Sequence, residues 1–148
     1  MVDETPVLVT RIIGILDEFL HLRNLKENWD GEGAVIPDIL SISYAENFVC
    51  LFDEDFKFPE TMLHDSGRVG LFWNDDSLFA DLEFLSDGTI AYYIKKGMQI
   101  FKGVTHFDGV NIPEELNHLR FKESSATQAN LTHSDIVGRV RFAISKLP

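Results

Sequence analysis

The apolar residues of this chain change their spacing at Arg68. Over residues 7–52 they recur every three to four positions, the period of an α-helix, whereas over residues 69–94 they alternate, the period of a β-strand. Helices followed by strands are typical of the α+β class, in which helices cover the apolar face of an antiparallel sheet. The length suits one domain, so we expect residues 1–148 to form a single α+β domain.

Two N-terminal segments carry the helical pattern. The first begins at Thr5-Pro6, a good N-cap and first-turn pair, and ends near Lys26. The second is expected to start at Pro37. Gly14 within the first helix is consistent with a close crossing of another element. The predicted apolar stripes are Leu8, Ile12, Ile15, Phe19 and Leu22 in the first helix, and Leu40, Tyr44, Phe48, Leu51 and Phe52 in the second.

The alternating segments predict a β-meander of about four strands. Three of them cover residues 69–73, 78–84 and 90–94, and a fourth strand is expected from Met98 to Lys102. Because the apolar side chains of paired strands must share a face, they also predict the register.

The second hairpin shows how this constraint selects a turn. A two-residue turn at Asp87-Gly88 would place the apolar sets of the two strands on opposite faces. A three-residue loop over 86–88 instead pairs Phe84 with Ile90 and brings both sets to one face, with Gly88 in the left-handed conformation. We predict the three-residue loop.

The first hairpin is interpreted in the same way. A four-residue loop over 74–77 would pair Trp73 with Leu78 and keep both apolar side chains on the buried face.

The last third of the chain has a weaker pattern. We expect a short helix at Pro113 and a polar linker over residues 124–130. Thr132 to Asp135 resembles a capping box that opens a last helix. The predicted fold is therefore an α+β fold in which an antiparallel β-meander of about four strands is covered on one face by two N-terminal helices, with a C-terminal helix.

One segment is distinctive: Asn28-Trp29-Asp30-Gly31, followed by Gly33-Ala34 and a Pro-led helix. A strand that ends in Trp73 follows, and then an Asp87-Gly88 turn before a strand with Tyr92-Tyr93. In these features the chain resembles a family of small uncharacterised bacterial proteins.

The resemblance covers roughly residues 20–95. Members of that family look like genes of phages and other mobile elements, so the resemblance implies a role in host–parasite conflict. It implies no activity and no catalytic residues. The chain departs from the pattern at Glu32, where an aromatic or less acidic residue is expected.

The net charge of −11 is concentrated in the first half. Residues 1–66 hold 14 Asp and Glu against 4 Lys and Arg, whereas residues 67–148 hold 10 against 9. Such a surface repels phosphate backbones, which argues against direct nucleic-acid binding. It favours a basic protein partner, although the same charge also keeps a small protein soluble.

Six residues in two acidic segments are the candidates for contact with a partner. Tryptophan is enriched at binding hot spots, and carboxylates can mimic the phosphates of a nucleic-acid backbone. The alternatives are that the tryptophan pins its loop to the core and that the carboxylates are merely solvated. The six candidates are Trp29, Asp30, Glu32, Asp53, Glu54 and Asp55.

Metal and nucleophilic chemistry have little support in the sequence. The acidic runs do not match a calcium loop, and no histidine pair has zinc-site spacing, so no metal or cofactor is expected. The single cysteine, Cys50, could act with His64-Asp65 as nucleophile and base, but it falls beside a buried stripe. We therefore expect no enzyme. The N-terminus lacks the basic start of a signal peptide and no apolar run approaches about 20 residues, so we expect a cytoplasmic protein with no membrane contact.

These observations predict that the chain is an acidic protein-binding module, such as an inhibitor, an antitoxin or an immunity protein. Such a module would occupy a basic surface of a nucleic-acid-handling partner. Two alternatives stay open. A small carboxylate- or metal-dependent enzyme would need several acids converging in a pocket. A structural accessory subunit would bind through an exposed apolar patch, with weak salt dependence.

Overall fold

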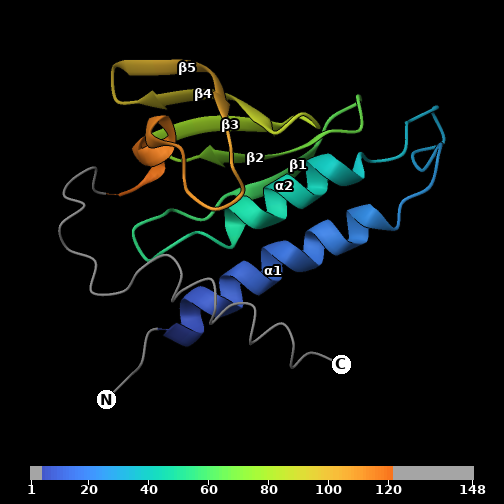
Figure 1. Cartoon of the computed structure of the whole chain (residues 1–148), viewed down its shortest axis with the longest axis horizontal. Helices are drawn as coiled ribbons and strands as arrows, with labels where there is room; N and C mark the ends of the chain where they lie inside the picture. The colour runs from blue at the N-terminus through green and yellow to red at the C-terminus, as the bar shows by residue number, and fades with distance from the viewer. Residues whose placement is uncertain (1–4, 122–148) are drawn as a thin grey trace.

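The computed structural model describes residues 5–121, in which two helices pack on one five-stranded antiparallel sheet (Figure 1). The helices are α1 (Thr5–Arg23) and α2 (Ile39–Val49), with a 3₁₀-helix η1 (Glu114–Leu119) near the end. The strands are β1 (Glu60–Leu63), β2 (Val69–Asn74), β3 (Leu78–Phe84), β4 (Thr89–Lys96) and β5 (Gln99–His106). They pair in the order of the chain, β1-β2-β3-β4-β5.

The α+β class is confirmed, but the sheet has five strands rather than about four. The additional strand is β1, which falls in a segment without alternation and pairs with β2 at the edge of the sheet. The fourth predicted strand corresponds to β5, which is longer than expected and ends at His106. The predicted linker over residues 124–130 and the C-terminal helix after Thr132 lie outside the described residues.

The predicted register of the second hairpin is confirmed. Phe84 pairs with Ile90, and Gly88 has a φ of 88°. The prediction for the first hairpin is wrong, because Trp73 pairs with Ala80 instead of Leu78. The shift is two residues, so every side chain keeps its face, and a shorter loop closed by the Asp75 side chain replaces the predicted one.

The inner face of the sheet and the two helices form the core. The buried line of α1 is as predicted from Leu8 to Phe19. Helix α2 begins at Ile39, two residues after the predicted start, because the Asp38 carboxylate caps it by accepting the N–H groups of Leu40 and Ser41. The predicted burial of Leu40 is wrong, since its side chain is 55% exposed. The buried residues of this helix are Ser41, Ile42, Ala45, Phe48 and Val49.

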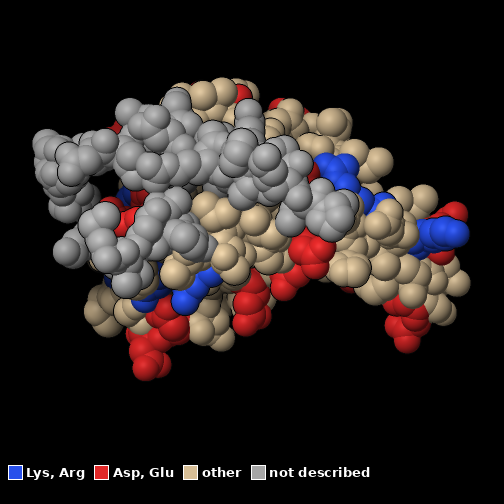
Figure 2. Space-filling model, turned by 90° about the horizontal axis from the view of Figure 1, so that it is seen from below, with Lys and Arg blue, Asp and Glu red and all other residues tan. Residues whose placement is uncertain are grey.

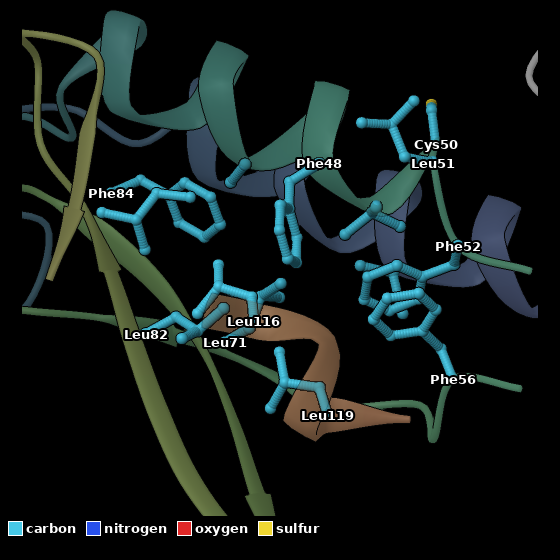
Figure 3. Packing of buried hydrophobic residues seen from close by; sticks show 14 of the residues in the cluster. Phe48, Cys50, Leu51, Phe52, Phe56, Leu71, Leu82, Phe84, Leu116 and Leu119 are labelled. Carbon is cyan, nitrogen blue, oxygen red and sulfur yellow. The ribbon is translucent and has the colours of Figure 1, made fainter. Parts of the chain in front are cut away.

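Phenylalanine rings link the layers of the core (Figure 3). Phe48 of α2 meets Phe52 and Phe84 edge to face, each with ring centroids 5.5 Å apart. Phe52 in turn stacks on Phe56 at 4.6 Å. Such pairs add specific geometry to the burial of large apolar area, so they fix how α2 lies on the sheet.

The segment after β5 returns across the inner face of the sheet. Leu116 and Leu119 of η1 are fully buried, and η1 packs against β4. The main-chain N–H of Phe121 donates to the carbonyl oxygen of Asp55 at 2.7 Å, which ties the end of the described chain to the connection between α2 and β1. Among the described residues, no helix has both the length and the apolar character needed to cross a membrane.

Candidate functional site

The loop that joins α1 to α2 is held in shape by its own hydrogen bonds. The N–H of Asn28 donates to the carbonyl oxygen of Ala34 at 2.7 Å, and the Asn28 side chain accepts the N–H of Gly33. The carboxylate of Asp30 accepts the N–H groups of Glu32 and Ala34 at 2.8 and 3.1 Å. Asp30 therefore builds the loop, while its position leaves it exposed to solvent.

Trp29 lies on the outside of this loop. Its side chain is 44% exposed, so it does not serve as a buried pin between the loop and the core. Glu32 beside it is also exposed. The hydrogen-bonded loop therefore leaves part of this large amphipathic side chain accessible at the surface.

Further apolar side chains are exposed where the loop leads into α2. We call the helix-connection surface the group of exposed side chains over this stretch: Trp29, Asp30, Glu32, Val35, Ile36, Ile39 and Leu40. Sequence reasoning missed the last four of these as binding candidates. The sequence signal for these four was a pair of large aliphatic residues on each side of Pro37-Asp38. Consecutive side chains at the start of a helix point in different directions, so they cannot all be buried on one helical face.

The second half of the helix-connection surface is fixed to the sheet. The N–H of Asp38 donates to the carbonyl oxygen of Gly67 at 2.7 Å. Gly67 has a φ of 88°, and a Cβ there would approach the carbonyl oxygen of Ile36 to 2.7 Å. The close approach of the two backbones therefore requires glycine, and it holds residues 35–38 against the turn between β1 and β2.

The second group of predicted contact residues follows α2. The carboxylate of Asp53 accepts a hydrogen bond from the Arg120 guanidinium and another from the N–H of Asp55. The guanidinium also lies over the Phe56 ring, 4.3 Å from its centroid. Asp53 is thus part of the contact between the α2–β1 connection and the segment after η1, whereas Glu54 and Asp55 are exposed.

The two groups of candidates lie at opposite ends of the helix layer. The loop that contains Trp29 precedes α2 and Glu54 follows it, so the two groups are at opposite ends of this helix. Figure 1 shows the connection from α1 to α2 at one end of the helix layer and the connection from α2 to β1 at the other. Figure 2 shows acidic side chains spread along the visible part of the helix side, with Lys and Arg among them. The six predicted residues therefore do not form one continuous patch.

The carboxylates with shifted pKa values are all stabilised as anions. A hydrogen bond from Lys57, supported by the N–H of Ser77, lowers the pKa of Asp75 to about 2. Hydrogen bonds within their own turns lower the pKa of Asp87 and of Asp108 in the same way. The pKa of Glu115 is also lowered, chiefly by a hydrogen bond from the Thr105 side chain.

The structure separates the candidate groups for metal binding and nucleophilic catalysis. Within residues 5–121, no group of three or more His, Cys, Asp or Glu side chains is placed to hold a metal ion. Cys50 is buried at the end of α2, whereas His64 begins the turn after β1, next to Glu83 with 3.5 Å between Nδ1 and Oε1. The turn that begins with His64 lies against Asp38 at the start of α2, so Cys50 and His64 are at opposite ends of this helix.

Comparison with protein-family models, with curated proteins and with solved structures found no match to this chain. The family resemblance over residues 20–95 stays a prediction.

Proposed function

We propose that this chain is an acidic protein-binding module that occupies a basic surface of a nucleic-acid-handling partner, in the manner of an inhibitor, an antitoxin or an immunity protein. The observation that carries the proposal is the helix-connection surface. It combines five exposed large apolar side chains within residues 29–40 with the exposed carboxylates of Asp30 and Glu32. We also propose that the protein is encoded by a phage or another mobile element and acts in the cytoplasm.

The rigidity of the surface favours binding. Hydrogen bonds within the loop fix Trp29, and the contact between Asp38 and Gly67 fixes the residues that follow. A surface that is ordered before binding loses less conformational entropy in the complex, so more of the contact energy appears as affinity. Trp29 and the aliphatic side chains would supply that energy, because buried aromatic anchors usually dominate interfaces.

The acidic residues have a different part in the proposal. Carboxylates at the edge of an interface mainly raise the association rate with a basic partner and select against acidic ones. Asp30 and Glu32 can contribute at the helix-connection surface. Glu54 and Asp55 can contribute to the same contact only if the partner extends along α2, whose 11 residues measure roughly 16 Å.

The test is affinity purification with the full chain from a nuclease-treated lysate of the native host, read by mass spectrometry at low and high salt. The variants are Trp29→Ala, Glu32→Lys and the control Val110→Ala, which truncates an exposed aliphatic residue outside the helix-connection surface. We expect wild type and the control to retain the same basic protein. Trp29→Ala should lose it at both salt concentrations, and Glu32→Lys should retain less of it at low salt.

If all variants retained the partner equally, the helix-connection surface would not be the site that binds it. The absence of any specific partner would contradict a binding role. A partner retained equally at both salts would favour the structural accessory subunit, the second candidate, which the exposed aliphatic side chains also support. A small carboxylate- or metal-dependent enzyme stays an untested prediction.

A further inference from the structure

The face of the sheet opposite the helices is uncovered within the described part of the chain (Figure 1). Strand alternation places Phe72, Asp81, Tyr93 and Lys102 on this outer sheet face, in one row across β2 to β5. Phe79 lies in the next row and is 43% exposed. The solvated face of an antiparallel sheet is normally polar, so these three aromatic rings require an explanation.

The aromatic side chains form the centre of the outer sheet face. Phe79 on β3 meets Tyr93 on β4 edge to face, with ring centroids 6.1 Å apart. Ile100 and Val104 on β5 extend the apolar area and are exposed. An exposed apolar area of this kind marks an interaction site.

Asp81 lies in the same central row, between Phe72 and Tyr93. Its Oδ1 atom is buried and has no hydrogen-bond partner among the described residues. Glu83, two residues along β3, contacts Arg68 and His64 instead. A shielded carboxylate oxygen without a donor is costly, so Asp81 lacks a cation or an N–H group that a bound partner would supply.

The charges of the outer sheet face are divided between its two halves. Asp81 and Glu83 lie on β3, whereas Lys95 and Lys102 lie on β4 and β5. Both lysines are exposed on this face. A surface with its acids on one side of an aromatic centre and its lysines on the other is complementary to a copy of itself turned by 180°.

We propose that a second copy of this chain docks on the outer sheet face and forms a two-fold symmetric dimer. A two-fold axis that runs along the strands between β3 and β4 places β3 of one subunit over β4 of the other. Asp81 then faces Tyr93 of the partner subunit, with the rings of Phe79 and Tyr93 on either side of the axis. Lys95 of the partner subunit lies two residues further along that strand, diagonal to Asp81, where its long side chain can reach the Asp81 carboxylate. Two antiparallel sheets packed in this way are about 10 Å apart, a gap that side chains from both faces fill.

The experiment measures the oligomeric state of the full chain by sedimentation velocity and native mass spectrometry. Wild type should be a dimer at micromolar concentration. The two-fold axis creates the contact between Asp81 and Lys95 twice. Asp81→Lys and Lys95→Asp each place like charges at both copies of this contact, so each should weaken dimerisation by roughly a hundredfold. An equal mixture of the two variants should regain a heterodimer, because each contact then joins opposite charges. Asp76→Lys, in an exposed turn beyond the face, is the control and should leave the dimer intact.

The opposing outcomes are distinct. A monomeric wild type at all concentrations overturns the proposal, and a cross-link from a reactive group at position 79 to residues 122–148 would then assign the face to the chain's own C-terminal segment. A dimer that tolerates both charge reversals overturns this face as the interface. Phe79→Ser tests the aromatic centre without changing charge, and it should also weaken the dimer. Thermal unfolding of each variant shows that the fold is retained.

Discussion

The hydroxyl of Ser41 donates a hydrogen bond to the main-chain carbonyl oxygen of Phe84 at 2.5 Å. The same hydroxyl oxygen accepts the N–H of Val69 at 2.9 Å. The ladder between β2 and β3 begins one pair further on, at Gly70 and Glu83. Ser41 therefore takes the place of the next ladder bond and connects α2 to both central strands.

Replacing Ser41 with alanine should destabilise the fold by about 1–3 kcal/mol, because it leaves the buried carbonyl of Phe84 and the N–H of Val69 without their partner. Urea unfolding followed by circular dichroism measures the change. Ser86→Ala, in the exposed turn before β4, is the control and should change stability by less than about 0.5 kcal/mol. Equal stability of the two variants would mean that water replaces the hydroxyl.

The pairing of Phe84 with Ile90 was predictable because a shift by one residue would have turned every apolar side chain of β4 to the wrong face. The pairing of Trp73 was not, since a shift by two residues preserves both faces. There the turn decides, through hydrogen bonds from Ser77 and Leu78 to the Asp75 carboxylate. The requirement that apolar side chains share one face therefore excludes register shifts by an odd number of residues but not shifts by an even number.

The candidate site was predictable only in part. The glycines and acids around Trp29 indicated a compact loop, and that loop is present. The role of Asp53 was hidden, because its partner Arg120 is 67 residues away and no local pattern connects them. Leu40 fits an apolar stripe by residue type, which predicts that it is buried, yet it is exposed. The adjacent polar Ser41 is buried instead, because its hydrogen bonds to the sheet offset the cost of burying a hydroxyl.

Gly70 pairs with Glu83 where β2 lies close against the backbone of β3. A Cβ atom at this position would come within 2.1 Å of the Leu82 carbonyl oxygen and 3.2 Å of Nε2 of His64. Gly70→Ala should therefore force the strands apart and destabilise the fold by about 1–3 kcal/mol. Chemical denaturation measures this effect. A variant as stable as wild type would show that the two strands separate at little cost.

Gly14 differs from Gly70 in having free space around it, so Gly14→Ala is the matched control for Gly70→Ala. It is in the middle of α1, and a Cβ atom there meets no other atom within 4 Å, so the expectation of a close crossing at this position is wrong among the described residues. Gly14→Ala should stabilise the fold by about 0.5–1 kcal/mol, because alanine loses less backbone entropy in a helix. Thermal unfolding tests this gain. A loss of stability would indicate that a segment outside residues 5–121 packs on α1.

The ion pair between Lys57 and Asp75 gives a pH-dependent prediction. The folded state lowers the pKa of Asp75 from 3.8 to about 2, so the pair stabilises the fold above about pH 4, and this contribution is lost as the pH falls from 4 to 2. Asp75→Asn should cost about 1 kcal/mol or less at pH 7, since the Asp75 side chain is 47% exposed, and nothing below pH 2. Urea unfolding at a series of pH values measures the difference. Asp76→Asn removes a charge from the same turn outside the Lys57 hydrogen bonds and serves as the control.

Asp53 and Glu54 are adjacent acids that the structure uses differently. Asp53 accepts a charge-assisted hydrogen bond from Arg120 in a contact where both side chains are largely buried, whereas Glu54 is exposed. Asp53→Ala should therefore destabilise the fold by about 2 kcal/mol, while Glu54→Ala should change it by less than about 0.5 kcal/mol. Thermal and urea unfolding of both variants distinguish these outcomes.

This difference decides how the acidic segment after α2 can be tested for partner binding. A loss of binding in an Asp53 variant would mix a weakened fold with a lost contact, so Glu54 and Asp55 are the positions at which charge reversal reports on the partner alone. If Asp53→Ala proves as stable as Glu54→Ala, the Arg120 guanidinium must be satisfied by its other acceptor, Oδ1 of Asn117 at 3.0 Å. Asp53 would then join Glu54 and Asp55 as a carboxylate available to a basic partner.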